Sequence, residues 1–175
     1  MTVLKDAPAR TSAAKTETTL KSILVHVEAT PAASPRLQVA VDLARMFDAT
    51  LLGVGVEMIQ TYADPYGMLG GDWVVQLQGL IEDDLKRAEE TFRAKTAGLN
   101  TDWTSVEAFP APAIARHARS ADLVVAGGAP LGREGSYRAA DAAELAIQCG
   151  RPVLVAPPKP GKFYGRAVVV AWKNV

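Results

Sequence analysis

From Lys21 onwards, short apolar runs alternate with longer segments of helical period. The runs are rich in Val, Ile and Leu, as is typical of parallel strands that are buried on both faces. In the segments between them, apolar residues recur every three or four positions, which is the period of an amphipathic helix. This alternation predicts repeated βα units built around one parallel sheet.

The pattern predicts five strands and four helices. We expect the strands at 22–28, 50–57, 103–109, 121–126 and 152–156. We expect the helices at 36–47, 72–97, 112–119 and 137–148. The predicted apolar stripe of the second helix consists of Val75, Leu77, Leu80, Ile81, Leu85, Ala88 and Phe92.

Three segments fall outside this pattern. Residues 1–20 show no sustained period and are predicted to be a flexible tail, and residues 59–72 contain Pro65 and three glycines and are predicted to be a loop or lid. Residues 21–157 then form one domain, and 158–175 begin with a Pro/Gly-rich linker. The end of that last segment, AVVVAWKN, parallels SILVHVEA of the first strand, which suggests a second copy that stops after one strand. The alternative is an ordinary terminal strand added to the edge of the sheet.

Composition narrows the class of protein. Lysine and arginine number 19 and acidic residues also number 19, so the chain has no net field that would attract nucleic acid or an anionic membrane surface. A single cysteine, Cys149, excludes an intramolecular disulfide and a multi-cysteine metal site. The apolar runs are far shorter than the roughly 20 residues that a membrane span requires. We therefore expect a soluble, cytoplasmic protein.

Two segments are candidates for a binding site. Ligands of doubly wound sheets lie beyond the carboxyl ends of the strands, at the place where the winding reverses. The first segment is the end of strand one, with His26, Val27, Glu28 and Ala29. The second is the glycine-bearing loop after strand four, whose candidate binding residues are Gly127, Gly128, Gly132, Gly135 and Ser136.

The order of these motifs resembles the universal stress protein (UspA-like) family. KSILVHVEATP, LARMFDATLLGVGV, ARSADLVVAGG and CGRPVLVAP carry the resemblance, which extends over residues 21–157. It implies an α/β fold of the adenine-nucleotide alpha-hydrolase type, with a five-stranded parallel sheet in the order 3-2-1-4-5 and helices on both faces. In nucleotide-binding members of the family, an Asp at the end of strand one contacts the adenosine and a glycine loop after strand four surrounds the phosphates with backbone amides.

The sequence departs from that family pattern. Glu28 stands in place of the strand-one Asp, and Pro130 stands in place of the second glycine of the loop and has no amide proton to offer an anion. Near the terminal Gly-Ser pair of the pattern the chain has Asp141, which brings a carboxylate towards the expected phosphates. These changes predict a degraded phosphate loop. The alternative is a displaced amide nest formed by Gly132, Gly135 and Ser136.

Several polar residues have a structural interpretation as well. Glu28 is a candidate cap for the following helix as much as a ribose contact. His26 lies in an apolar strand and is predicted to be a hydrogen-bonded core residue, whereas His117 is predicted to face solvent. Neither histidine has the companions that a Ser-His-acid triad or a histidine metal site requires.

These observations favour a stress-response or signalling domain that is not an enzyme. We expect it to form a homodimer through the fifth strand, to need no cofactor and to bind a small ligand weakly or not at all. The alternative is an ATP- or AMP-binding member that acts as a nucleotide-dependent switch. A third hypothesis, a nucleotidyl-transfer or electron-transfer-flavoprotein-like enzyme, has only fold analogy in its favour.

Overall fold

The sheet of this protein is fully parallel and has the predicted strand order. The computed structural model describes residues 20–58, 71–127 and 140–159. The strands are β1 (Ser22–His26), β2 (Thr50–Glu57), β3 (Thr101–Glu107), β4 (Leu123–Gly127) and β5 (Val153–Ala156). They are arranged as β3-β2-β1-β4-β5, and every neighbouring pair is parallel. The predicted fold class is confirmed.

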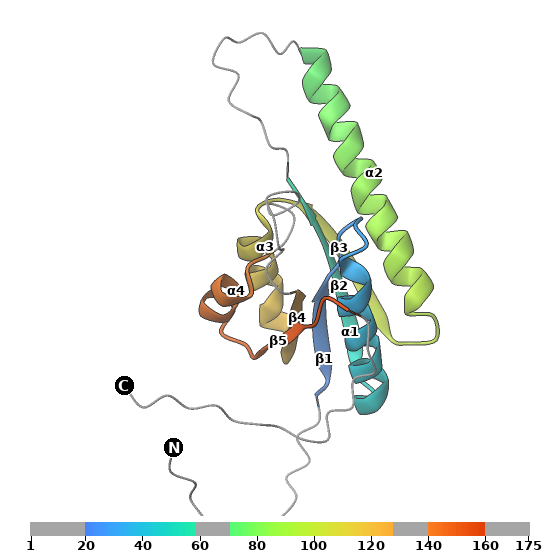
Figure 1. Cartoon of the computed structure of the whole chain (residues 1–175), viewed down its shortest axis with the longest axis vertical. Coiled ribbons are helices and arrows are strands. Elements are labelled where there is room, and N and C mark those ends of the chain that lie inside the picture. Colours follow the sequence, from blue (N-terminus) through green and yellow to red (C-terminus); the bar gives the residue numbers. More distant parts are fainter. Residues whose placement is uncertain (1–19, 59–70, 128–139, 160–175) are drawn as a thin grey trace, which may run out of the picture.

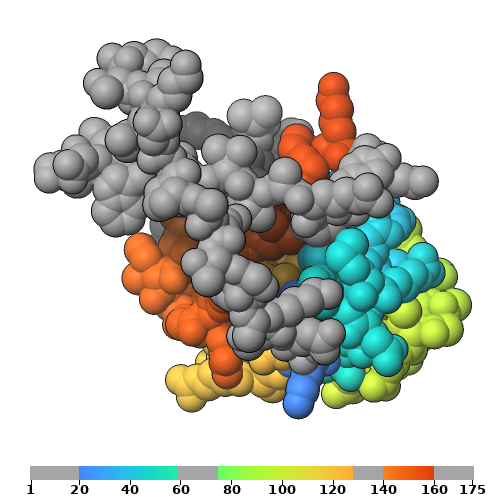
Figure 2. All heavy atoms as spheres, turned by 90° about the horizontal axis from the view of Figure 1, so that it is seen from below, coloured from blue at the N-terminus to red at the C-terminus, as the bar shows by residue number. Residues whose placement is uncertain are grey.

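Helices cover both faces of the sheet (Figure 1). Helices α1 (Ala33–Phe47) and α2 (Gly71–Lys95) lie on one face, and α3 (Pro110–His117) and α4 (Ala142–Gln148) lie on the other. A short 3₁₀ turn, η1 (Ala118–Ser120), follows α3. In the view from below in Figure 2, the cyan and green residues of α1, β2 and α2 occupy one side of the molecule, and the orange residues of α4 and β5 occupy the other. The sheet is therefore the middle layer of three.

Each face of the sheet has its own apolar core, because successive residues of a strand point to opposite faces. The core under α1 and α2 includes Ile23, Val25, Leu37, Leu51 and Phe92. The core under α3 and α4 includes Leu24, Val54, Val56, Ile114 and Leu145.

Several element boundaries differ from the prediction. Strand β1 ends at His26, and α1 already begins at Ala33, because the carbonyls of Thr30 and Pro31 accept hydrogen bonds from Ala33 and Ser34 and start the first turn. Strand β3 is shifted two residues towards the amino terminus, to Thr101–Glu107, and α3 likewise begins earlier, with Pro110 in its first turn. Proline is well suited to that position, since its amide would be unpaired there in any case.

The apolar stripe predicted for α2 is wrong at its amino-terminal end. Val75 is 67% exposed and Leu80 is 59% exposed, whereas Ile81, Ala88 and Phe92 are buried. The reason is visible in Figure 1, in which the amino-terminal part of α2 extends past the sheet and has no described element beneath it. The period of the apolar residues thus predicted the helix correctly, but it did not show which turns of the helix pack on the sheet.

Other predictions lie outside the described residues. They concern the tail at 1–19, most of the loop at 59–72 and the strand-like repeat at 167–174, so the division into tail, domain and second copy stays a prediction. Within the described ranges, no helix is long and apolar enough to cross a membrane.

The absence of a side chain at Gly53 of β2 allows side chains of α2 and β3 to pack closely against this strand. A Cβ at this position would lie 2.6 Å from Trp103 and 2.7 Å from Phe92, whose rings contact each other with centroids 5.2 Å apart. We predict that Gly53→Ala lowers the free energy of unfolding by about 1–3 kcal/mol through overpacking. Urea denaturation measures this change.

The matched control for that experiment is Gly79→Ala in α2. Nothing lies within 4 Å of a Cβ at Gly79, so the alanine gains only helix propensity, worth about 0.5–1 kcal/mol. A Gly53→Ala protein as stable as the wild type would contradict the close packing described for β2.

Candidate functional site

The winding of the sheet reverses between β1 and β4. From β1 the chain proceeds outwards to β2 and β3, and it then crosses to β4 and β5 on the other side. The carboxyl ends of β1 and β4 therefore flank the position at which doubly wound folds bind ligands. The residues that gather at this position belong to β1, to the connection between β1 and α1, to the first turn of α1 and to the end of β4.

A buried cluster of charged and polar side chains occupies this position. His26, Glu28 and Arg36 are only 2%, 4% and 4% exposed. Arg36 Nη2 lies 3.4 Å from Glu28 Oε2, and His26 Nδ1 lies 3.6 Å from the same oxygen. Arg36 Nε donates a hydrogen bond of 2.7 Å to the main-chain carbonyl of His26. The guanidinium thus joins the end of β1 to α1.

Local geometry explains how Arg36 reaches the end of β1. Arg36 lies in the first turn of α1, and side chains on a helix lean towards its amino terminus. The side chain therefore points back over the β1–α1 connection. A cation near a helix amino terminus is unfavourable, because the partial charge there is positive. The carboxylate of Glu28 compensates for it.

His26 is a neutral core residue. Burial, followed by the positive charge of Arg36, lowers the pKa of His26 from 6.5 to about 3. The main chain of Val56 interacts with the ring and raises the pKa slightly against these two effects. Neither ring nitrogen has a described partner in full hydrogen-bond geometry, so the expectation of a core histidine is confirmed and that of a well-formed hydrogen bond is not. A group with this pKa and this burial is a poor proton acceptor for catalysis at neutral pH.

Glu28 does not cap α1, and that interpretation is wrong. The N-cap residue of α1 is Ala32, and no side chain makes a capping hydrogen bond there. Instead, Glu28 Oε1 accepts a hydrogen bond of 3.1 Å from Thr30 Oγ1, and Oε2 faces Arg36 and His26. The carboxylate is thus held inside the protein by its own neighbours.

The other predicted residues of the first segment have separate roles. The amide of Val27 continues the pairing with β2 by donating to the carbonyl of Val54, and its side chain is fully buried. Ala29 lines a hollow of about 430 Å³ between the β1–α1 connection and α2. The remaining lining residues of this hollow are Glu28, Thr30, Pro31, Ser34, Arg87, Glu90, Thr91 and Lys95.

Only part of the predicted phosphate loop is described. Gly127 is the last residue of β4 and pairs with Ala156 of β5. A Cβ at Gly127 would lie 2.5 Å from Arg36 Nη1, so the guanidinium is packed directly against this glycine. The other members of the second segment, Gly128, Gly132, Gly135 and Ser136, lie outside the described residues, as does Pro130.

Asp141 has a structural role at the far end of that loop. It is the N-cap of α4, and its carboxylate accepts hydrogen bonds from the amides of Ala143 and Glu144, at 2.7 and 3.3 Å. Helix α4 therefore begins at Ala142, and the prediction of a start at position 137 is wrong. An acidic residue directly before a helical pattern is a recognised N-cap signal that could have identified this boundary.

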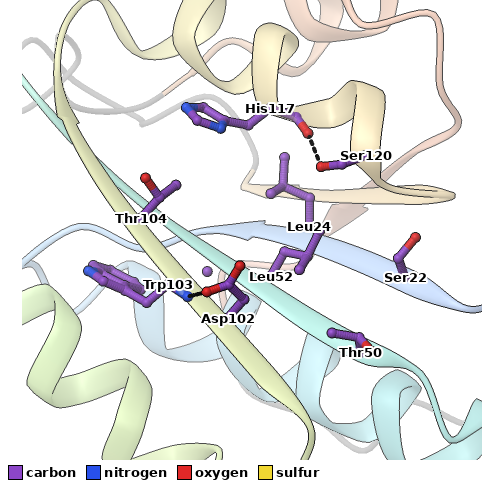
Figure 3. A pocket seen from close by; sticks show the side chains of 10 residues that line it. Ser22, Leu24, Thr50, Leu52, Asp102, Trp103, Thr104, His117 and Ser120 are labelled. Atoms are coloured by element: carbon purple, nitrogen blue, oxygen red, sulfur yellow. Dashed lines mark hydrogen bonds between the residues drawn. The ribbon is translucent and has the colours of Figure 1, made fainter.

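A second hollow of about 430 Å³ lies on the α3 side of the sheet, near the amino ends of the strands (Figure 3). Leu24 and Leu52 form its floor, and Asp102, Thr104 and His117 are among its walls. His117 is half-buried in the wall of this hollow, so the expectation that it faces solvent is confirmed in part. This hollow is at the opposite end of β1 from the buried cluster.

Comparison with solved structures identifies the fold. The chain is similar to the universal stress protein UspA from Lactobacillus plantarum, with 20% identity, a TM-score of 0.61 and coverage of 78% of this chain and 97% of that chain. It is also similar to a universal stress protein in complex with cAMP (16% identity, TM-score 0.52, coverage 81% and 100%). A universal stress protein family protein from Arabidopsis thaliana with AMP bound gives 14% identity, a TM-score of 0.52 and coverage of 78% and 91%.

No family model matches the sequence, and no curated protein matches it either. The structural likeness is nevertheless consistent across these solved proteins, and it extends over nearly their full length. The chain has the universal stress protein fold.

The low pKa of His26 generates a prediction about stability. The unfolded chain protonates His26 near pH 6.5 and the folded chain only near pH 3, so between these values the unfolded state binds more protons. The contribution of His26 to the free energy of unfolding is fully present above pH 6.5, where the residue is neutral in both states. It decreases as the pH falls below 6.5. The expected slope from this residue is about 1.4 kcal/mol per pH unit once the pH is well below 6.5.

Urea denaturation between pH 5 and 7 measures this slope, with the variant His26→Asn expected to reduce it. His117→Asn is the matched control, because His117 is the other histidine of the chain and lies away from the cluster. An unchanged slope in His26→Asn would show that the folded protein admits a proton at His26.

Proposed function

We propose that this chain is a universal stress protein-like domain with a stress-response or signalling role that it performs by self-association rather than by catalysis. We further propose that it does not bind nucleotides in the manner of its nucleotide-bound structural neighbours. The observation that carries the proposal is that Glu28, at the position where the fold offers a ligand site, is buried and faces Arg36 of the same chain.

A carboxylate that binds ribose hydroxyls must present an oxygen to the ligand. Here Oε1 accepts a hydrogen bond from Thr30. Oε2 has no hydrogen-bond partner among the described residues, but it lies 3.4 Å from Arg36 Nη2 and 3.6 Å from His26 Nδ1 and is buried. Withdrawing Arg36 to admit a ligand would leave the carboxylate buried without its cation, which typically costs about 3–5 kcal/mol. A nucleotide would have to offset that cost before any net affinity remained.

The edge strand β5 supports self-association. It is the last strand of the sheet and pairs only with β4 among the described strands. Its residues Val153 and Leu154 are partly exposed and Val155 is 48% exposed, so this edge combines apolar side chains with backbone groups that no described strand pairs on the outer side. Such an edge favours pairing with a second chain.

A nucleotide-dependent switch is the second candidate function. Two of the structural neighbours are described as complexes with cAMP and with AMP. In this chain the hollow beside Glu28 has a volume of about 430 Å³, which falls within the size range of small-molecule sites.

The first test is a nucleotide titration of the purified chain. Isothermal titration calorimetry with AMP, cAMP and ATP plus Mg²⁺ is expected to give no saturable heat up to about 1 mM, which corresponds to a binding free energy weaker than about −4 kcal/mol. Saturable binding of any of the three in the micromolar range would replace the proposal with the nucleotide switch.

The second test addresses self-association. Light scattering coupled to size-exclusion chromatography is expected to give a dimer for the wild type and a monomer for Val155→Lys, because a lysine on an edge strand opposes pairing. Ile147→Lys is the matched control, since Ile147 is 85% exposed on α4 and lies outside β5. A wild-type monomer, or equal masses for all three proteins, would contradict association through β5.

A further inference from the structure

The guanidinium group of Arg36 lies in the crevice between the ends of β1 and β4, against a main-chain carbonyl, a carboxylate and a glycine. We propose that this crevice is a binding site for an alkylguanidinium group, and that the chain's own Arg36 occupies it. Guanidinium binding in this crevice goes beyond the proposed function, because the result of a nucleotide titration does not decide it.

Three groups of the site match the planar head group of arginine. The carbonyl of His26 accepts a hydrogen bond from Nε at 2.7 Å. The carboxylate oxygen Oε2 of Glu28 lies 3.4 Å from Nη2 and supplies the opposite charge. Nη1 is packed against Gly127. A guanidinium presents its donors in one rigid plane, whereas the ammonium of lysine has no such fork, so the site selects for shape as well as for charge.

Gly127 gives this site a steric requirement. A Cβ at position 127 would lie 2.5 Å from Arg36 Nη1, closer than any unstrained contact. An alanine here would force the head group of Arg36 to move, and the hydrogen bond from Nε to the carbonyl of His26 opposes that movement. The glycine that matches the start of a phosphate loop has a second physical role in this chain, and that role needs no phosphate.

A hollow lies next to the site, and Glu28 belongs to both. Glu28 contacts Arg36 with one oxygen, and the same residue lines the hollow of about 430 Å³ between the β1–α1 connection and α2. Removing the arginine side chain beyond Cβ takes away the occupant but keeps the carbonyl of His26, the carboxylate of Glu28 and the space at Gly127. A small alkylguanidinium ion of the size removed would then meet the same carbonyl, the same carboxylate and the same space at Gly127.

Chemical rescue of Arg36→Ala tests the proposal. The substitution is expected to lower the melting temperature, since it leaves Glu28 buried without its cation. Ethylguanidinium at roughly 10 mM is expected to recover a large part of that loss, with a dependence on concentration that saturates as binding to the folded state requires. Ethylammonium and urea at the same concentration are expected to recover none of it, and wild type is expected to respond to none of the three.

The variant Glu28→Gln/Arg36→Ala is the matched control, because it lacks the carboxylate and should lose the rescue. Equal responses to ethylguanidinium and ethylammonium, no response to either, or an undiminished rescue in this double variant would each overturn the proposal.

A second measurement applies if Arg36→Ala does not fold. Gly127→Ala is made in the wild type and in Glu28→Gln/Arg36→Met, in which the head group is absent and no buried charge is left unpaired. The alanine is expected to lower the melting temperature of the wild type much more than that of the double variant, because only the wild type holds a guanidinium against position 127. Equal losses in both backgrounds would show that Gly127 does not serve Arg36.

Discussion

Two opposite charges are buried where the sheet reverses its winding, and the local structure depends on their contact. Glu28 and Arg36 are each 4% exposed, and the desolvation of such a pair is expensive unless further polar groups surround it. Here Thr30 binds the carboxylate and the carbonyl of His26 binds the guanidinium. The pair therefore fixes the path of the chain from β1 into α1, and it determines what space remains at the place where this fold would admit a ligand.

Hydrophobic patterning predicted the repeated βα units because the sheet is covered on both faces, whereas the strand order 3-2-1-4-5 was predicted from the resemblance to universal stress proteins. Uninterrupted apolar strands such as β1 and β2 have that character only when helices cover both sides, and the intervening helical periods supply those helices. The apolar pattern alone does not show whether the sheet lies under every turn of a helix. Val75 and Leu80 continue the stripe of α2 but are exposed, because the sheet ends before the helix does.

The candidate site was predicted only in part, since its central residue carries no local signal. Glu28 and Gly127 were identified by their position at strand ends, and the structure brings both within contact of Arg36. Arg36 itself was only the first residue of a predicted helix, and an arginine at a helix start usually faces solvent. One clue was available in the sequence: Arg36 shares a helix face with Ala40 and Ala44. The structure shows that both alanines are buried and that Arg36 faces Glu28, two residues beyond the end of β1.

A glycine at the end of β4 therefore has two physical explanations that a motif cannot separate. Backbone amides that hold a phosphate require glycine for its dihedral freedom, whereas a guanidinium packed against the main chain requires it for the absence of a Cβ. In this chain the second requirement is met by a contact of the described residues, with Arg36 Nη1 where a Cβ would otherwise lie. The residue that fills the crevice thus also accounts for a glycine at position 127. This explanation does not depend on the residues that follow Gly127, because the contact is made by the end of β4 and by Arg36 alone.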